Sequence, residues 1–234
     1  MLLPGSASER TRAVTATDSE HRQGARGVID SATMQSAADA IRTVLEKFST
    51  SLAQITRANE IPDTSAGFRP ENDAEHSYEL ALVAIVVADL IDHDLDRGLV
   101  ARLALVHDLE EIYCGDVSVF DPASSSDTRA AEKDAASARV LDDLRGLAPA
   151  VAADFQIYLE RTCAEARFVY ALDKIVPFFR VLHNGRHHAH PSLEEYRARY
   201  ATARSKIAEY PPLLPVFEHV YDEVGARLPD LNSN

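Results

Sequence analysis

The sequence predicts an all-α protein, folded as a single globular bundle of roughly seven or eight helices. Apolar residues recur at spacings of three and four along most of the chain, which is the period of a helix with one buried face. Residues that start and stop helices stand at the edges of these segments, and no segment shows the alternation typical of a strand. Hydrophobic residues make up 46% of the 234 positions, which is ample for one core.

The N-terminal region differs from the rest in composition. Residues 1–33 are rich in Ser, Thr, Ala, Arg and Gly and lack apolar periodicity, so we expect a disordered tail followed by one folded domain over residues 34–234. The opening "MLLPGSASER" lacks the basic and apolar stretches of a signal peptide. Translation from Met34 is an alternative explanation for the tail.

Three helices are predicted in the first half of the folded domain. Asn72 and Glu75 have the spacing of a capping box, and the helix that they begin ends near His93. A third helix spans roughly 97–113 and stops at Gly115, because glycine adopts a left-handed conformation most easily. The apolar stripe of the first helix is Ile41, Val44, Leu45, Phe48, Leu52 and Ile55. The stripe of the second helix is His76, Leu80, Val83, Val87 and Leu90.

The second half continues with helices separated by loops. The segment 120–128 has the composition of a loop and supplies caps for an Ala-rich helix over about 128–145, and Pro149 suits the first turn of the next helix. Pro177 interrupts a later helix, so it should free the carbonyl of Asp173 and kink the axis. The apolar stripe of that helix is Phe168, Leu172, Ile175, Phe179 and Leu182. After a loop over 184–192, two last helices are expected over about 192–208 and 213–226.

Charge and cysteine content limit the classes of partner. The formal net charge of −13 argues against a nucleic-acid polymer or an anionic membrane surface, since both attract cationic faces. The longest aliphatic run, at 80–91, is shorter than the ~20 residues that a membrane span needs. Cys114 and Cys163 have neither metal-binding nor redox spacing, so we expect reduced thiols in a cytoplasmic protein.

The stretch "RLALVHDLEEIYCGD" places polar residues on a helix face that is otherwise apolar. At 3.6 residues per turn, Asp108 lies about 100° and Glu111 about 40° around the axis from His107. The three share this sector with the apolar residues 103–105, which predicts that they are buried. Burying a polar group without a hydrogen bond costs roughly 2–7 kcal/mol, so some partner must satisfy these side chains.

His76 and Asp173 interrupt apolar stripes on two other helices in the same way. Two imidazoles and two carboxylates suit Zn, Mn, Co or Fe, so one divalent cation would explain all four exceptions. His76 lies in a first helical turn, where the helix dipole favours the neutral ring that can bind a metal. For each residue taken alone, the alternative is a hydrogen-bonded core residue without a ligand.

Other polar residues near these motifs have simpler interpretations. Glu75 serves as the capping-box partner, and Glu110, about 60° to the other side of His107, is expected to be solvated or salt-bridged. The pair at 93–94 resembles a solvated turn. The three histidines within 187–190 form a loop cluster that could bind a metal adventitiously.

Three segments together are more specific than a single His-Asp pair: "RPENDAEHSYELALVA" at 69–84, "LALVHDLEEIYCGD" at 103–116 and "EARFVYALDKI" at 165–175. Their combination resembles the H…HD…D pattern of the HD-domain metal-dependent phosphohydrolases. It is most similar to the branch that contains the 5′-deoxynucleotidases, which act on nucleoside 5′-monophosphates. The similarity covers about residues 36–185 and implies a helical bundle of the HD-domain type.

The resemblance implies a role for each matching residue. It implies that one divalent cation (Mn, Co, Zn, Fe or Mg) is held by His76, His107, Asp108 and Asp173. Glu111 matches an acidic residue that assists proton transfer, and Asp116 matches one near the substrate sugar. Arg57 resembles a phosphate-binding arginine, although its spacing to the first histidine is longer here. These relatives carry Trp where this chain has Ala58, so selectivity for deoxyribose is not implied.

The implied activity is removal of phosphate from a nucleoside 5′-monophosphate or a similar small phosphate monoester. Such esters hydrolyse very slowly unless a metal supplies charge and activates water. Arg57, together with Lys133 or Arg69, would face the phosphate oxygens, and Glu111 would manage the proton. The absence of histidine between Asp108 and Asp173 predicts a mononuclear site rather than the two-metal sites of oxygenase or cyclic-nucleotide relatives.

The alternative is a non-catalytic metal- or nucleotide-binding regulator that keeps the fold. Glu111 beside the ligand set favours the enzyme, since a binding protein does not need a proton carrier. The predicted partner is a small phosphorylated substrate, and a homodimer is expected. The segment "PPLLPVFEHVY" would serve either the dimer interface or the core.

Overall fold

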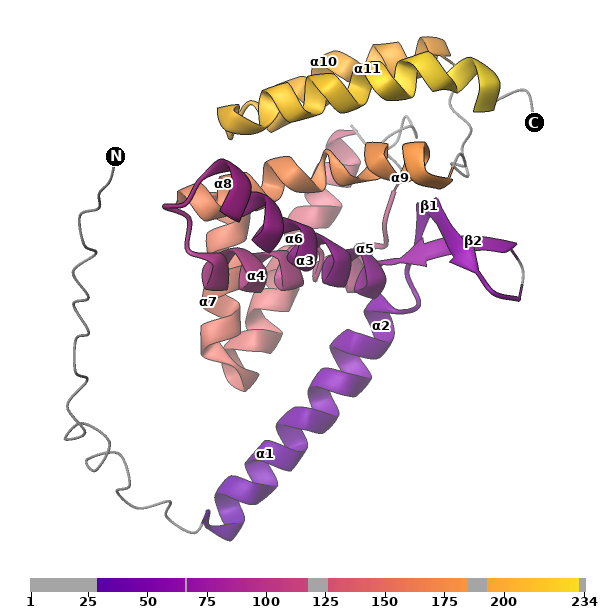
Figure 1. Ribbon diagram of the computed structural model, residues 1–234. Coiled ribbons are helices and arrows are strands. Elements are labelled where there is room, and N and C mark those ends of the chain that lie inside the picture. Colours follow the sequence, from indigo (N-terminus) through magenta and orange to yellow (C-terminus); the bar gives the residue numbers. More distant parts are fainter. Residues whose placement is uncertain (1–28, 66, 118–125, 185–192, 232–234) are drawn as a thin grey trace, which may run out of the picture. The chain divides into compact units, whose positions relative to one another are not determined.

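A computed structural model of the protein describes residues 29–65, 67–117, 126–184 and 193–231 (Figure 1). Contacts divide the chain into a unit over Met1–Asp39 and a larger unit over Ala40–Asn234. The described part of the first unit holds the start of α1 (Ser31–Thr43), where the carboxylate of Asp30 accepts a hydrogen bond from the amide of Thr33 at 2.7 Å. Residues 1–28 of the expected tail, most of the loop 120–128 and the histidines within 187–190 lie outside the described residues.

The larger unit is a helical bundle, as the sequence predicts. A π-helical segment (Val44–Ser49) and the short α2 (Thr50–Leu52) follow α1 directly. The bundle helices are α3 (Asp73–Ile91), α4 (Arg97–Val106), α5 (Glu111–Cys114), α6 (Asp127–Leu147), α7 (Pro149–Glu160), α8 (Ala164–Asp173), α9 (Val176–Asn184), α10 (Leu193–Ile207), a 3₁₀ turn (Pro211–Leu213) and α11 (Leu214–Leu231). None of the helices that the structure describes combines the length and the apolar character that a bilayer crossing requires.

A small antiparallel hairpin, β1 (Thr56–Asp63) and β2 (Gly67–Asn72), precedes α3 (Figure 1). The expectation that no segment forms a strand is wrong here. Pro62 and Pro70 argue against a central strand, but a two-stranded sheet has only edge strands, where proline is tolerated. The register is irregular between Thr56 and Glu60. The hairpin matters for the site because β1 carries Arg57 and β2 leads directly into α3.

The buried face of α3, a helix in close contact with α4, is rich in alanine. Leu80, Ala84 and Ala88 are fully buried, whereas Val83 and Leu90 are 37% and 78% exposed, so the predicted stripe is wrong at these two positions. Small side chains let two helices approach closely. The alanine face of α3 is therefore buried at the interface, and the larger aliphatic side chains are left on the exposed face. Leu105, also expected to be buried, is 51% exposed on α4.

The first predicted stripe is buried only at its C-terminal end. Phe48 and Leu52 are buried, but Ile41, Val44 and Leu45 are 62%, 45% and 55% exposed. The two buried residues join a core cluster with residues of α6 and α7, such as Val140 and Phe155. The N-terminal part of the stripe lies outside this cluster, which explains why helical periodicity alone overestimated its burial.

The ends of the helices follow their local sequence. Asn72 and Glu75 form the predicted capping box, and Gly115 ends α5 with a positive φ of 68°. The helix expected over 97–113 is interrupted, because residues 107–110 form a turn between α4 and α5. Pro177 has a stronger effect than the expected kink, since α8 ends at Asp173 and a new helix begins at Val176.

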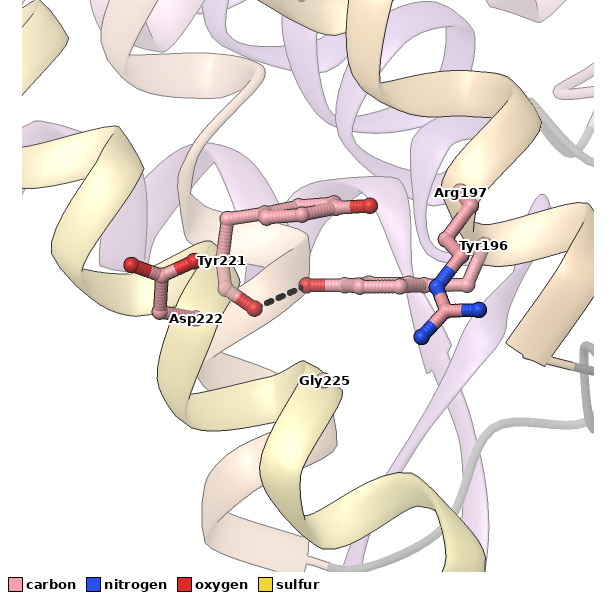
Figure 2. A pocket seen from close by; sticks show the side chains of 5 residues that line it. All are labelled: Tyr196, Arg197, Tyr221, Asp222 and Gly225. Carbon is pink, nitrogen blue, oxygen red and sulfur yellow. Dashed lines mark hydrogen bonds between the residues drawn. The ribbon is translucent and has the colours of Figure 1, made fainter.

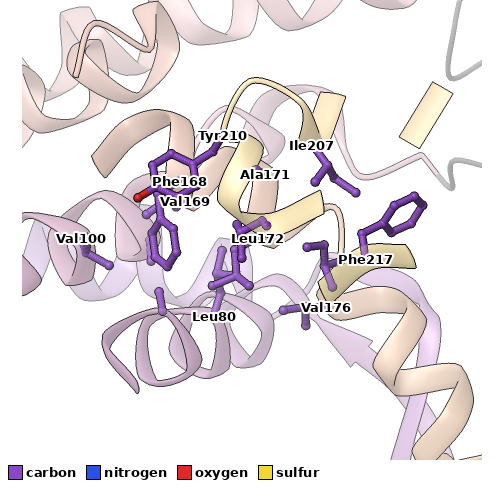
Figure 3. Close-up of a cluster of buried hydrophobic side chains, with 14 of the residues drawn as sticks. Leu80, Val100, Phe168, Val169, Ala171, Leu172, Val176, Ile207, Tyr210 and Phe217 are labelled. Atoms are coloured by element: carbon purple, nitrogen blue, oxygen red, sulfur yellow. The ribbon is translucent and has the colours of Figure 1, made fainter. Parts of the chain in front are cut away.

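The main core lies where α3, α4 and α8 meet α9, α10 and α11 (Figure 3). Its fully buried members include Leu80, Val100, Phe168 and Phe217. Leu213 and Phe217 are both 0% exposed, which assigns the C-terminal apolar segment to the core.

Aromatic residues join α10 to α11. The rings of Tyr196 and Tyr221 are stacked with centroids 4.4 Å apart, and the Tyr196 hydroxyl donates a hydrogen bond to the Tyr221 carbonyl at 2.7 Å (Figure 2). These residues line a pocket together with Arg197, Asp222 and Gly225 (Figure 2). None of the predicted site residues belongs to this pocket.

Candidate metal centre

The structure brings the four predicted ligands together. His76, His107, Asp108 and Asp173 each offer one ligand atom, and these atoms all lie within 4.8 Å of one another. The two imidazole side chains are fully buried, and the two aspartates are almost so. His76 Nε2 lies 2.9 Å from Asp173 Oδ1, and His107 Nε2 lies 2.9 Å from Asp108 Oδ2.

Helix ends determine where these side chains lie. His76 is in the capped first turn of α3, and His107 and Asp108 occupy the turn that follows α4. Asp173 is the last residue of α8, and its Oδ2 accepts a hydrogen bond from Lys174 Nζ at 2.5 Å. This ion pair leaves Asp173 Oδ1 facing the two imidazoles, with His107 Nε2 at 3.6 Å.

Both imidazoles turn Nε2 toward the cluster. The Nδ1 of His107 lies 2.8 Å from the carbonyl oxygen of Ala104, so Nδ1 carries the proton and donates it there. Burial lowers the pKa of His76 to about 4, which keeps that ring neutral near physiological pH. Burial also opposes protonation of His107, but the carboxylates of Asp108 and Asp173 outweigh it and raise the pKa of His107 to about 10.

The donor set fits a divalent cation. Two buried carboxylates face two imidazoles, and His107 Nε2 has no hydrogen-bond partner among the described residues. A proton on His107 would offset part of the carboxylate charge, and a cation would take the place of that proton. Neutral imidazole and carboxylate are ordinary ligands of Zn, Mn, Co and Fe, so the donor set alone does not select one ion.

Arg57 reaches the cluster from β1. Its Nη1 donates hydrogen bonds to Asp108 Oδ2 at 2.8 Å and to Asp73 Oδ1 at 3.0 Å, and its side chain is only 12% exposed. Burial opposes the charged form of Arg57, but Asp108 and Asp116 outweigh burial and raise the pKa of the guanidinium. The strand therefore delivers a permanent positive charge to one edge of the ligand cluster.

Glu111, the predicted proton carrier, lies on the same side as Arg57. Asp73, Asp108 and Glu111 form a second group of carboxylates whose ligand atoms lie within 4.8 Å of one another. Burial, followed by the charge of Asp108, raises the pKa of Glu111 well above its usual value. Such a carboxyl group can hold a proton near neutral pH, which a general acid requires.

Lys133, on α6, contacts Glu111 directly. Its Nζ lies 2.9 Å from Glu111 Oε1 and 3.4 Å from Glu110 Oε1. Glu110 is therefore salt-bridged, one of the two expectations for it, but it is buried rather than solvated. Lys133 remains 40% exposed, so it lies between the buried acids and the solvent.

Asp116 and Arg69 have different positions relative to the cluster. Asp116 directly follows Gly115, and the Arg129 guanidinium fixes this segment by donating hydrogen bonds to the carbonyls of Cys114 and Gly115. Burial raises the pKa of Asp116, while the charge of Arg57 opposes that shift. Arg69 instead pairs with the carboxylates of Glu75 and Asp63, and among the described residues it forms no ion pair with a member of the cluster.

Three polar neighbours of the cluster were missed in the sequence: Asp73, Glu71 and Lys174. Asp73 and Glu71 are 0% exposed, and both lie close to Arg57. Burial and the charge of Asp108 raise the pKa of Asp73 to about 6, and burial raises the pKa of Glu71 against the opposing charges of Arg180 and Arg57. Acidic residues are ordinary just before and within a first helical turn, so sequence position alone gave no signal of their burial.

A helical bundle with a two-histidine, two-aspartate cluster at its helix ends defines a class of metal-binding domain. Residues 50–212 match the family model described as HD domain. The chain belongs to this family.

Curated relatives carry the name 5′-deoxynucleotidase HDDC2. The zebrafish (Danio rerio) protein is 28% identical over 127 residues, covering 52% of this chain and 61% of its own length. The Xenopus laevis protein is 26% identical over 163 residues, covering 68% of this chain and 77% of its own length. The human (Homo sapiens) protein is 31% identical over 109 residues, covering 45% of this chain and 50% of its own length. The matched regions thus span less than two thirds of the zebrafish and human proteins.

A solved structure shares the fold over nearly its whole length. It is a predicted metal-dependent phosphohydrolase from Magnetospirillum magnetotacticum MS-1, 26% identical in sequence with a TM-score of 0.64. The match covers 86% of this chain and 97% of that one. The resemblance read from the sequence motifs is confirmed by these comparisons at the level of the family and its 5′-deoxynucleotidase relatives.

Proposed function

We propose that this protein is a metal-dependent phosphohydrolase that removes phosphate from a nucleoside 5′-monophosphate or a similar small phosphate monoester. The observation that carries the proposal is the meeting of three features: a buried N2O2 ligand cluster, the Arg57 guanidinium 2.8 Å from Asp108, and the buried acid Glu111. The names of the vertebrate relatives and of the Magnetospirillum protein support the same class of reaction.

His76, His107, Asp108 and Asp173 would hold one divalent cation. A cation at that place would supply Lewis-acid charge to the phosphoryl group and lower the pKa of water. The protein contributes orientation: the Ala104 carbonyl fixes His107, and Lys174 fixes the carboxylate of Asp173.

Arg57 would bind the non-bridging phosphate oxygens. Its guanidinium stays charged at every relevant pH and offers several donors in one plane, which matches the geometry of a phosphoryl group. Asp73 and Asp108 accept hydrogen bonds from its Nη1, and these two contacts orient the guanidinium. This preorganisation reduces the entropy cost of binding.

Glu111 would move the proton. Hydrolysis of a phosphate monoester takes a proton from the attacking water and gives one to the leaving sugar oxygen. Glu111 has a raised pKa and an oxygen held by Lys133, so it can hold a proton at a fixed place beside Asp108. Asp116 would accept a hydrogen bond from the sugar, and Lys133 would add positive charge near the phosphate.

A non-catalytic regulator is the competing function, and one experiment separates the two. Phosphate release from a panel of ribo- and deoxyribonucleoside 5′-monophosphates is measured with Mn²⁺ or Co²⁺, for the parent and for Asp108→Ala. The enzyme proposal expects release by the parent and loss of release in the variant. Equal release from both proteins, or no release by the parent on any substrate, would reject it.

We further propose that the protein is a cytoplasmic homodimer. The support for the dimer is an apolar stripe on α3, where Tyr78, Leu82, Val86 and Leu90 are 66%, 54%, 53% and 78% exposed. Residues four apart share one helix face, and such a face can pair with its own copy about a two-fold axis. Light scattering on the parent and on Leu82→Glu tests this arrangement, with a dimer expected for the parent and a monomer for the variant.

A further inference from the structure

We propose that Glu71 is a positioning residue for the candidate metal centre: it accepts a hydrogen bond from Nδ1 of His76 and thereby keeps Nε2 of that ring turned toward the other ligands. The inference rests on the proposed metal-dependent function, which it deepens. It assigns a role to a buried acid that belongs neither to the ligand set nor to the proton-transfer group.

Two buried atoms without partners carry this inference. His76 Nδ1 and Glu71 Oε2 both lack a hydrogen-bond partner within the described parts of the chain. The two atoms lie 3.8 Å apart, and both side chains are 0% exposed. The neutral His76 ring has one N–H, and with a cation on Nε2 that proton lies on Nδ1. A movement of less than 1 Å that joins Nδ1 to Glu71 Oε2 would then satisfy both atoms, and a buried polar group without a partner costs about 1–3 kcal/mol.

The other imidazole of the cluster, that of His107, has the kind of hydrogen bond that we propose for His76. The Nδ1–H of His107 donates a hydrogen bond to the Ala104 carbonyl oxygen at 2.8 Å, and this bond fixes both the tautomer and the ring orientation. His76 lies at the start of its helix, and Glu71, at the end of β2, is the acceptor nearest to its Nδ1 in the ion pairs of the described residues. Histidine ligands commonly donate their outer nitrogen to a carboxylate or a carbonyl, which also increases the basicity of the inner nitrogen.

Glu71 lies beside two arginines, one of which forms a hydrogen bond with it. Arg180 Nη2, from α9, lies 3.3 Å from Glu71 Oε1, and Arg57 Nε lies 3.9 Å from Glu71 Oε2. The Arg180 contact fixes one carboxylate oxygen and leaves the other facing His76. The same carboxylate thus lies between the first metal ligand and the proposed phosphate-binding arginine.

If Glu71 served only to stabilise the fold, it would act through its contact with Arg180. A second glutamate that contacts Arg180 provides a matched control for that possibility. Glu79 pairs with the same Arg180 guanidinium, but its side chain is 36% exposed and makes no ion pair with a ligand residue in the described part of the chain. Glu79→Gln therefore perturbs Arg180 without touching His76. Glu71→Gln keeps an acceptor oxygen for Nδ1, whereas Glu71→Ala removes it.

The first measurement is Mn²⁺ affinity of the full chain, by competition with a chelator, with circular dichroism to verify folding. Glu71→Ala should weaken Mn²⁺ binding by about 10- to 100-fold, which is the usual effect of losing an outer partner of a ligand. Glu71→Gln should recover most of the affinity, and Glu79→Gln should bind like the parent. Unchanged affinity in Glu71→Ala, or an equal loss in Glu79→Gln, would overturn the inference.

The second measurement is spectroscopic, and it remains informative if Glu71→Ala folds poorly. In the Zn²⁺-loaded parent, the Nδ1 proton of His76 should give a downfield NMR signal that exchanges slowly with water, and Glu71→Gln should shift it. An identical signal in both proteins would contradict the proposal. If the parent binds Mn²⁺ but hydrolyses no substrate, the proposed activity fails while the role of Glu71 stands. If the parent binds no divalent cation, both fail.

Discussion

Replacing Arg57 with alanine should lower both stability and activity, and the structure gives the size of each effect. Arg57 Nη1 is shared by Asp73, which is 0% exposed, and Asp108. Removing one partner of a buried ion pair typically costs about 3–5 kcal/mol, because the remaining charge has no compensation. We expect a loss near the lower end, about 3 kcal/mol, because Asp73 can relieve its charge by binding a proton.

The pH dependence of this loss has a definite sign. Burial and Asp108 raise the pKa of Asp73 from 3.8 to about 6, and removing Arg57 would raise that pKa further. A carboxyl with a raised pKa binds a proton in the folded protein before it does so in the unfolded chain, so lowering the pH stabilises the folded state. The destabilisation of Arg57→Ala should therefore be smaller at pH 5.5 than at pH 7.5.

Urea unfolding of the metal-free proteins at the two pH values measures the stability change, and phosphate release measures activity. Loss of a charge-assisted contact to phosphate is worth about 1.5–3 kcal/mol, or roughly a 10- to 160-fold fall in kcat/KM. Arg69→Ala is the control, since Arg69 pairs only with Glu75 and Asp63 in the ion pairs of the described residues. Arg57→Ala losses that are greater at pH 5.5, or Arg69→Ala losses of equal size, would refute the reasoning.

Three further predictions test other parts of the site and the core. Glu111→Gln should lower kcat by about 10²- to 10⁴-fold, while its affinity for Mn²⁺ stays within a few-fold of the parent. Steady-state kinetics measures the first quantity, and chelator competition measures the second. A large loss of Mn²⁺ affinity would contradict a role in proton transfer. Because the pKa of His107 is raised to about 10 without metal, Mn²⁺ must displace a proton, so affinity should increase with pH between 6 and 8. Calorimetry in buffers of different ionisation enthalpy should detect that proton, and binding without proton release would disprove the assignment. Phe155→Ala, at a position that is 0% exposed, should cost about 3–5 kcal/mol in urea unfolding, and a cost below about 1 kcal/mol would contradict the described core.

The sequence predicted the parts of the fold that local chemistry controls. The capping box at Asn72, the stop at Gly115 and the helix start at Pro149 depend on residues next to one another in the chain. The cluster geometry could be anticipated because polar residues on apolar helix stripes need a common partner. Each of these signals needs no knowledge of how distant segments pack.

Features that depend on distant packing were not predictable from single segments. The hairpin contains Pro62 and Pro70 and has no simple alternation, so only its pairing reveals it. The buried face of α3 is chosen by the close approach of α4, which favours Ala84 and Ala88 over larger residues. Asp73 pairs with Arg57 of β1, and this contact between separate elements is not visible in the sequence around Asp73.

The central claim is that four side chains from three helical segments hold a single divalent cation. X-ray diffraction from crystals of the Mn²⁺-loaded full chain, recorded to measure the anomalous scattering of manganese, tests this claim most directly. We expect one strong anomalous peak within coordination distance of His76 Nε2, His107 Nε2 and the carboxylates of Asp108 and Asp173. A map with no peak among these four residues, or with its only strong peak elsewhere, would contradict it.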